Sequence, residues 1–198
     1  MRVVAGAARG RSLRSPEGER TRPTADRVRE AVFNALLSRG PIAGTRVVDL
    51  FAGSGALGIE AISRGATDVW FVESDRDAVA VIEDNLDTLG FRDVATVLAR
   101  PVQDVIDELP DEIDLVFADP PYDFDEWTDL LARLAPLTDA DAVVVVESDR
   151  SVVVPDGWEK MRERTYGGTV ITFTAPPATP AGRDGPPAEP TDATGADA

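Results

Sequence analysis

The sequence contains neither cysteine nor histidine among its 198 residues. These absences exclude catalysis by a thiolate, Ser-His-Asp triads and metal centres built from Cys or His ligands, and we expect no metal site. They also exclude base methylation that begins with a cysteine attacking a pyrimidine ring. Any reaction must therefore use carboxylates, carbonyls, hydroxyls, aromatic rings or a bound cofactor.

The sequence also lacks an apolar run near the roughly 18 residues that a membrane helix needs. Residues 1–6 are not followed by the apolar core of a signal peptide. We therefore expect a cytoplasmic protein with no membrane partner. The length fits one α/β domain with a full hydrophobic core.

Positive charge is scarce, since 36 acidic residues outnumber 20 basic ones and the formal net charge is −16. The basic residues are nevertheless concentrated near the start of the chain. Residues 1–46 hold ten arginines and four acids, a net charge of +6, whereas residues 47–198 carry −22. A basic segment on an acidic body indicates contact with a polyanion, although a solvated end without a partner has the same composition.

The organisation of the chain follows from these composition changes. We expect residues 1–22 to form a basic arm with a small hairpin around residues 6–10, and residues 23–175 to form the main domain. Residues 176–198 contain six prolines and six alanines and nothing bulkier that is apolar. This composition predicts a disordered acidic tail, because it offers nothing from which a core could form.

Hydrophobic patterning after residue 45 alternates between strands and helices. Strands are predicted at 47–51, 69–72, 95–99, 113–118, 142–147, 158–166 and 169–174. Helices are predicted between them at 56–64, 76–89, 102–109 and 126–135. This order predicts a mostly parallel sheet with helices on both faces. Ligands bind such sheets beyond the carboxyl ends of the strands.

A glycine-rich turn follows the first of these strands, with the sequence Asp49-Leu50-Phe51-Ala52-Gly53-Ser54-Gly55-Ala56-Leu57-Gly58. Gly53 and Gly55 allow the backbone to turn tightly and to approach a ligand closely. The glycine spacing also satisfies the dinucleotide fingerprint of NAD enzymes, and such a turn can exist without a ligand. Asp49 favours S-adenosylmethionine, because an acid repels a pyrophosphate and attracts an ammonium and a sulfonium.

Glu73 ends the second predicted strand, 18 residues after Gly55. A carboxylate at this place can accept hydrogen bonds from both ribose hydroxyls of a nucleotide-like cofactor. Hydrogen bonds to a charged group contribute about 1.5–3 kcal/mol. The alternative is an exposed acid at a strand end with no ligand.

The sequence Asp119-Pro120-Pro121-Tyr122 follows the fourth predicted strand. Asp119 can accept one hydrogen bond from an amino group, and the Pro120 carbonyl can accept another. Together they would orient the nitrogen lone pair toward a methyl donor, and the prolines keep the turn rigid. Tyr122 offers a ring on which a base can stack, worth roughly 1–3 kcal/mol. Alone these residues could be an ordinary turn, but their place after the glycine loop and an acid-ended strand favours methyl transfer to an amine.

Together the three motifs resemble those of the Asp/Asn-Pro-Pro-aromatic amino-methyltransferases. The chain further resembles the RsmD family of bacterial 16S ribosomal RNA guanine-N2 methyltransferases. The residues that carry this resemblance are Arg22-Pro23-Thr24-Ala25-Asp26-Arg27-Val28-Arg29-Glu30-Ala31-Val32-Phe33-Asn34, Asp49 to Gly58 with Glu60-Ala61, Ser63-Arg64-Gly65-Ala66, and Val146-Glu147-Ser148.

The resemblance implies a Rossmann-like class I methyltransferase with a seven-stranded, mostly parallel sheet over residues 23–175. It implies S-adenosylmethionine as the methyl donor and the N2 amine of a guanine in 16S ribosomal RNA as the acceptor. We expect the protein to bind this RNA within small-subunit particles and to act as a monomer.

The expected site residues fall into three groups. The catalytic group is Asp119, Pro120 and Tyr122, and the cofactor group is Asp49, Gly53, Gly55, Glu73 and Arg100. The RNA-binding group is Arg9, Arg11, Arg14, Arg20 and Arg22. Methyltransferases of this fold usually have an Asp or Asn after the third strand that contacts the adenine amine of the cofactor. This chain has Arg100-Pro101 there, so we expect backbone groups near Arg100 to make the adenine contact instead.

Three other functions fit part of the sequence. An NAD-dependent dehydrogenase would use the glycine spacing but would not need Asp119-Pro120-Pro121-Tyr122. An adenine-N6 or protein-glutamine methyltransferase shares that motif, and the arginine-rich arm argues for RNA over both. A non-catalytic RNA-binding module would have no use for acids at three strand ends.

Overall fold

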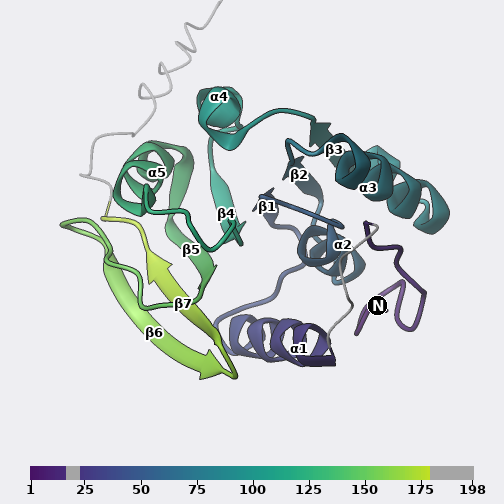
Figure 1. Ribbon diagram of the computed structural model, residues 1–198, viewed down its shortest axis with the longest axis horizontal. Helices are drawn as coiled ribbons and strands as arrows, with labels where there is room; N and C mark the ends of the chain where they lie inside the picture. The colour runs from purple at the N-terminus through teal and green to yellow at the C-terminus, as the bar shows by residue number, and fades with distance from the viewer. Residues whose placement is uncertain (17–22, 179–198) are drawn as a thin grey trace, which may run out of the picture.

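The computed structural model describes residues 1–16 and 23–178. Its strands are β1 Arg46–Leu50, β2 Asp68–Val72, β3 Ala95–Leu98, β4 Ile113–Ala118, β5 Thr138–Ser148, β6 Glu159–Tyr166 and β7 Thr169–Ala175. Within the described residues these seven strands form one sheet in the order β3-β2-β1-β4-β5-β7-β6 (Figure 1). The first five strands are parallel, and β7 and β6 join antiparallel at one edge. The predicted mostly parallel sheet is confirmed.

Helices cover both faces of this sheet. The α-helices are α1 Pro23–Leu37, α2 Ala56–Ser63, α3 Arg76–Leu89, α4 Val102–Val105 and α5 Trp127–Leu134, and the 3-10 turns are η1 Arg92–Val94, η2 Ile106–Glu108 and η3 Ala135–Leu137. Helices α1, α2 and α3 lie on one face, and α4 and α5 lie on the other (Figure 1). None of the helices in the described ranges is long and apolar enough to cross a membrane.

The alternation of side chains along β4 divides the core into two layers. Phe117 packs with Phe33 of α1 and Ile59 of α2 on one face. Val116 packs with Leu131 of α5 on the opposite face. Successive residues of a strand point to opposite faces, so the parity of a position decides which layer its side chain joins.

The N-terminal hairpin predicted around residues 6–10 is present. Arg2 forms an antiparallel bridge with Ser12. The Val3 N–H donates to the Arg11 carbonyl at 3.0 Å, and the Gly10 N–H donates to the Val3 carbonyl at 2.8 Å. Three apolar side chains of this hairpin, Val3, Ala8 and Leu13, are buried in the same core layer as α1 and α2. The hairpin is therefore part of the folded body.

Several predicted boundaries differ from the structure by one residue, and three differences change the local structure. Phe51 lies outside β1, because its φ of 58° turns the chain into the glycine loop. The helix predicted over 102–109 is a short α-helix followed by the η2 turn, which carries buried Ile106. Strand β5 begins at Thr138, ahead of the predicted residue 142, with an irregularity in its pairing to β4. Arg20, Arg22 and most of the predicted tail lie outside the described residues.

Candidate active site

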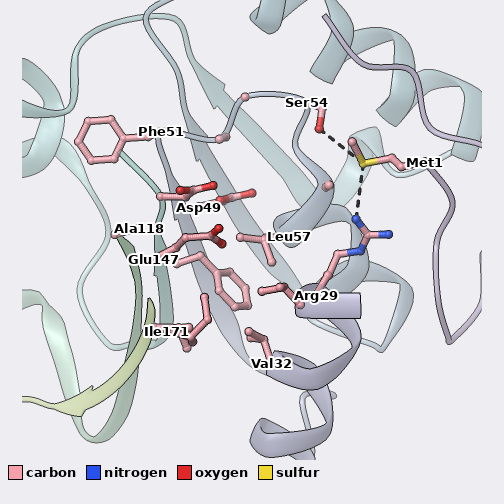
Figure 2. Close-up of a pocket in the computed structure, with 17 residues that line it drawn as sticks. Met1, Arg29, Val32, Asp49, Phe51, Ser54, Leu57, Ala118, Glu147 and Ile171 are labelled. Atoms are coloured by element: carbon pink, nitrogen blue, oxygen red, sulfur yellow. Dashed lines mark hydrogen bonds between the residues drawn. The ribbon is translucent and has the colours of Figure 1, made fainter. Parts of the chain in front are cut away.

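A pocket opens at the carboxyl ends of β1, β4 and β5, between the sheet and α1 (Figure 2). Asp49, Asp119 and Glu147 line it from the three strands, and Arg29 and Met1 line it from α1 and the chain start. The glycine loop that follows β1 forms its rim. The pocket therefore brings the two motifs predicted to hold a methyl donor and its acceptor amine to one place.

The glycine loop has a backbone that few residues other than glycine adopt. Gly53 has a φ of 53°, and Gly55, at the N-terminus of α2, has a φ of 74°. Gly58 has a different role, because a Cβ there would lie 2.3 Å from Cε1 of Phe71. The third glycine of the fingerprint thus allows α2 to pack closely on β2, and only the first two shape the loop.

Asp49 is the buried acid beneath this loop, with 2% of its surface exposed. Its Oδ2 accepts a hydrogen bond from the Gly58 N–H at 2.8 Å. Burial raises the pKa of the Asp49 carboxyl to about 8; the Gly58 N–H opposes this, and the charges of Asp119 and Glu73 add to it. A cation bound above Asp49 would favour its ionised form.

Glu73 joins the glycine loop to the end of β2. Its Oε2 accepts from the Gly53 N–H at 2.8 Å, and its Oε1 accepts from the N–H groups of Ser74 and Asp75 at 2.7 and 2.8 Å. Glu73 also lines a second cleft, together with Gly53 and the hairpin residues Arg14, Ser15 and Pro16. The carboxylate is therefore held in one orientation by the backbone.

The sequence Asp119-Pro120-Pro121-Tyr122 leaves β4 at the mouth of the pocket. Asp119 is exposed, Pro120 is buried and Tyr122 is 57% exposed. The Arg150 guanidinium donates to the carbonyls of Tyr122 and Phe124, each at 3.3 Å. These contacts hold the segment after the motif and leave the Tyr122 ring accessible to solvent.

Glu147 also lines the pocket, although it was not among the predicted site residues. The register of β4 and β5 pairs Ala118 with Val146, so Asp119 and Glu147 follow side by side. Burial raises the pKa of Glu147 to about 8, and the charge of Asp119 adds to the effect. The signal in the sequence was an acid near the end of a buried strand, the same signal that marked Asp49 and Glu73.

Arg29 is the second residue that was overlooked. It is 4% exposed and lies on α1, within the segment that carried the family resemblance. Its Nη2 donates to the Arg2 carbonyl at 2.6 Å, and its Nη1 donates to Sδ of Met1 at 3.5 Å (Figure 2). A buried arginine therefore ties the chain start to the pocket wall.

The arginines predicted to bind ligands have different surroundings. Arg9 is exposed, whereas the Arg11 Nη2 donates to the Thr88 carbonyl at 2.9 Å and Arg14 pairs with Asp84. Arg100 forms an ion pair of 2.8 Å with Glu108 and donates to the Asp104 carbonyl at 3.0 Å. Its side chain thus contacts the segment after β3, and an adenine contact by backbone groups near Arg100 stays a prediction.

Comparison with known proteins shows the family to which this chain belongs. A family model described as "Conserved hypothetical protein 95" matches residues 1–175. The ribosomal RNA small subunit methyltransferase D of Haemophilus influenzae is 34% identical over 174 residues, 84% of this chain and 89% of that protein. The protein of the same name from Escherichia coli K12 is 36% identical over 173 residues, covering 84% and 85% of the two chains. The chain belongs to the RsmD family.

Solved structures support this membership of the RsmD family. The yhhF protein of Escherichia coli has a TM-score of 0.80 and 32% identity, covering 90% of this chain and 99% of that chain. The TTHA0928 protein of Thermus thermophilus has a TM-score of 0.73 and 32% identity, covering 87% and 98%. The SMU.776 protein, solved in complex with SAH, has a TM-score of 0.61 at 12% identity, covering 75% of this chain and 48% of that chain, which shows a similarity of fold alone.

Proposed function

We propose that this RsmD-family chain transfers a methyl group from S-adenosylmethionine to the exocyclic N2 amine of a guanine in 16S ribosomal RNA. The observation that carries the proposal is the shared pocket of Asp49 and Asp119, with the glycine loop at its rim. A donor over the loop and an amine at Asp119 would then be neighbours. The relatives' names, which refer to the small subunit's ribosomal RNA, support the choice of substrate.

The residues around the glycine loop fit this cofactor. When bound, S-adenosylmethionine supplies an electrophilic methyl group on a cationic sulfur. Asp49 lies where a carboxylate would stabilise positive charge, and the turn of Gly53 and Gly55 allows close approach of a ligand to the backbone. The acidic residues of this pocket would repel the pyrophosphate of a dinucleotide, which argues against a dinucleotide as the cofactor.

Glu73 fits a ribose, with one refinement. An ionised carboxylate has about four acceptor positions, and three backbone N–H groups already use three of those on Glu73. Oε2 keeps room for one ribose hydroxyl. A second hydroxyl would have to replace the Ser74 or Asp75 N–H at Oε1, so we propose one direct ribose contact at this carboxylate.

The acceptor amine is proposed to lie against Asp119 and the Pro120 carbonyl. These two groups would accept its two hydrogens and turn the nitrogen lone pair toward the methyl group, which aligns a poor nucleophile for attack. The Asp119 carboxylate would also stabilise the positive charge that develops on nitrogen, and the proton that the methylated nitrogen then loses would pass to Asp119 or to water. The accessible Tyr122 ring offers a stacking surface for the guanine.

The experiment is methyl transfer from isotope-labelled cofactor to naked 16S RNA, assembling small subunits and DNA, followed by nucleoside analysis. We expect label in N2-methylguanosine from the RNA or the subunits, and an initial rate at least about a hundredfold lower with the Asp119→Ala variant. Label in N6-methyladenosine or in protein glutamine would instead support the related amino-methyltransferases. Binding of RNA without any transfer would support the non-catalytic module.

A further inference from the structure

Asn85 of α3 is a buried amide that binds two separate parts of the chain. It is 2% exposed. Its Oδ1 accepts from the Arg14 N–H at 2.8 Å, and its Nδ2 donates to the carbonyls of Arg14 and Ser54, each at 3.1 Å. Arg14 lies near the end of the N-terminal hairpin segment, residues 1–16, and Ser54 lies between the two left-handed glycines of the loop. One side chain therefore ties the hairpin to the glycine loop.

A second contact repeats this link on the other side of the loop. The Ser54 hydroxyl donates to Sδ of Met1 at 3.8 Å, and Met1 is held in turn by buried Arg29 (Figure 2). Ser54 thus contacts the hairpin directly through its hydroxyl, and its carbonyl is linked to the hairpin through Asn85. The loop between Gly53 and Gly55 has the hairpin as a direct neighbour.

The hairpin also contributes surface to both cavities beside the loop. Met1 lines the pocket that holds Asp49 and Asp119. Arg14 and Ser15 line the cleft that holds Glu73. The segment predicted to be an RNA arm is therefore also a wall of the proposed cofactor site.

The hairpin has a separate attachment that does not involve the loop. The Ser63 hydroxyl on α2 accepts from the Ala8 N–H at 2.9 Å and donates to the Ala5 carbonyl at 2.5 Å. Like Asn85, Ser63 is buried and binds hairpin backbone. Unlike the Asn85 amide, the Ser63 hydroxyl makes these bonds to the hairpin without also binding the glycine loop, which makes it a matched control.

We propose that Asn85 is a positioning residue that makes the N-terminal hairpin a structural part of the cofactor site. Its amide holds the Ser54 carbonyl and the Arg14 backbone in fixed relation, and this sets the shape of the loop that receives the methyl donor. Asn85 acts through the loop and touches no reacting atom. The inference rests on the proposed function, because it takes the glycine loop as the cofactor site.

The test compares Asn85→Ala with Ser63→Ala in the full chain. Both remove buried hydrogen bonds to the hairpin, so both should lower the melting temperature. Calorimetric titration with S-adenosylhomocysteine, well below both melting temperatures, should give a dissociation constant about tenfold or more higher for Asn85→Ala. Ser63→Ala should stay within about twofold of the parent. In methyl-transfer assays, KM for the cofactor should rise in Asn85→Ala while kcat at saturating cofactor stays within about threefold.

A near-isosteric variant keeps the test open if Asn85→Ala does not fold. Asn85→Asp retains an acceptor for the Arg14 N–H but can no longer donate to the Ser54 carbonyl. It should therefore also lower the affinity for S-adenosylhomocysteine. Equal affinities for the Asn85 and Ser63 variants, with normal binding by the parent, would overturn the inference alone. A parent protein that binds no S-adenosylhomocysteine would overturn the proposed function, and this inference with it.

Discussion

The ring of Phe51 meets the ring of Phe124 edge-on, with their centroids 5.4 Å apart. Phe51 begins the glycine loop after β1, and Phe124 follows the Asp119–Tyr122 turn after β4. Phe51 adopts a φ of 58°, which is rare for a bulky residue and costs about 1–3 kcal/mol. The ring contact helps to hold this conformation, and it packs the proposed donor loop against the proposed acceptor turn.

Removal of the Glu73 carboxylate should weaken cofactor binding. We expect Glu73→Ala to lower the affinity for S-adenosylmethionine by about 1.5–3 kcal/mol, the range for hydrogen bonds to a charged group. Part of this loss comes from the Gly53 N–H, which would lose its 2.8 Å acceptor. Isothermal calorimetry measures the change, with Asp87→Asn, an exposed acid near the far end of α3, as the control. An unchanged affinity in a folded variant would remove Glu73 from the site.

Asp49 should make the stability of the free protein depend on pH. Its pKa of about 8 in the folded state lies above the ordinary value of 3.8, so the folded chain keeps a proton that the unfolded chain releases. The stability from this proton is complete below about pH 4 and is lost as the pH rises toward 8. Asp49→Asn should therefore gain stability over the parent, by an amount that grows to the order of a few kcal/mol between those pH values.

Thermal unfolding of the parent and of Asp49→Asn at pH 5 and pH 8 checks this expectation. The difference in melting temperature should be larger at pH 8, while the same substitution weakens the affinity for the cationic cofactor. A difference that is equal at both pH values would show that Asp49 does not carry the proton.

The strand-end residues could be predicted from the sequence, because each is a local signal. An acid or a glycine that follows an apolar run marks a site wherever parallel strands end together, and this identified Asp49, Glu73 and Asp119. Asn85 carries no such signal. It is a polar residue on the apolar face of an amphipathic helix, where Ala78 and Ile82 are also buried, and its partner Arg14 is 71 positions away in the sequence. Only the docking of the hairpin on α3 shows which backbone groups this amide binds.

The docking of the hairpin also changes how the basic arm should be tested. Deletion of the whole segment would remove a wall of the proposed cofactor site, so single charges must be removed instead. Arg9 is exposed, and the Arg11 guanidinium donates to the Thr88 carbonyl at the surface. Arg9→Ala and Arg11→Ala should each flatten the log–log dependence of RNA affinity on salt by about 0.7, the value for one phosphate contact on a single strand.

Filter binding or anisotropy across a salt series measures these slopes. Cofactor affinity should not change in either variant, and Arg133→Ala, on the opposite face of the sheet, should leave the slope as it is in the parent. Arg14→Ala should have a smaller effect, because its guanidinium already pairs with Asp84. Parent-like slopes for both arm variants would mean that the arm makes no phosphate contacts.

The Tyr122 ring should act in binding the base and not in the chemistry. Its ring is accessible, and loss of a stacked base contact weakens binding by roughly 1–3 kcal/mol. Tyr122→Ala should therefore raise KM for RNA by about tenfold or more, with a smaller change in kcat. Tyr122→Phe should be mild because stacking needs the ring and not the hydroxyl. A Tyr122→Phe variant as impaired as Tyr122→Ala would assign the role to the hydroxyl.

Asp119 should carry the largest effect on turnover. The guanine amine shares its lone pair with the ring, and Asp119 is proposed to hold one of its hydrogens and to stabilise the charge that forms as the methyl group arrives. Loss of a comparable preorganised group lowers kcat by about a hundredfold to a thousandfold, and we expect the same for Asp119→Ala. Cofactor affinity should change little, because the glycine loop keeps its contacts with Glu73 and Asn85. Single-turnover methyl transfer to the RNA substrate separates this chemical step from binding. Near-normal turnover in Asp119→Ala would make the mechanism wrong and would reassign the Asp119–Tyr122 turn to a structural role.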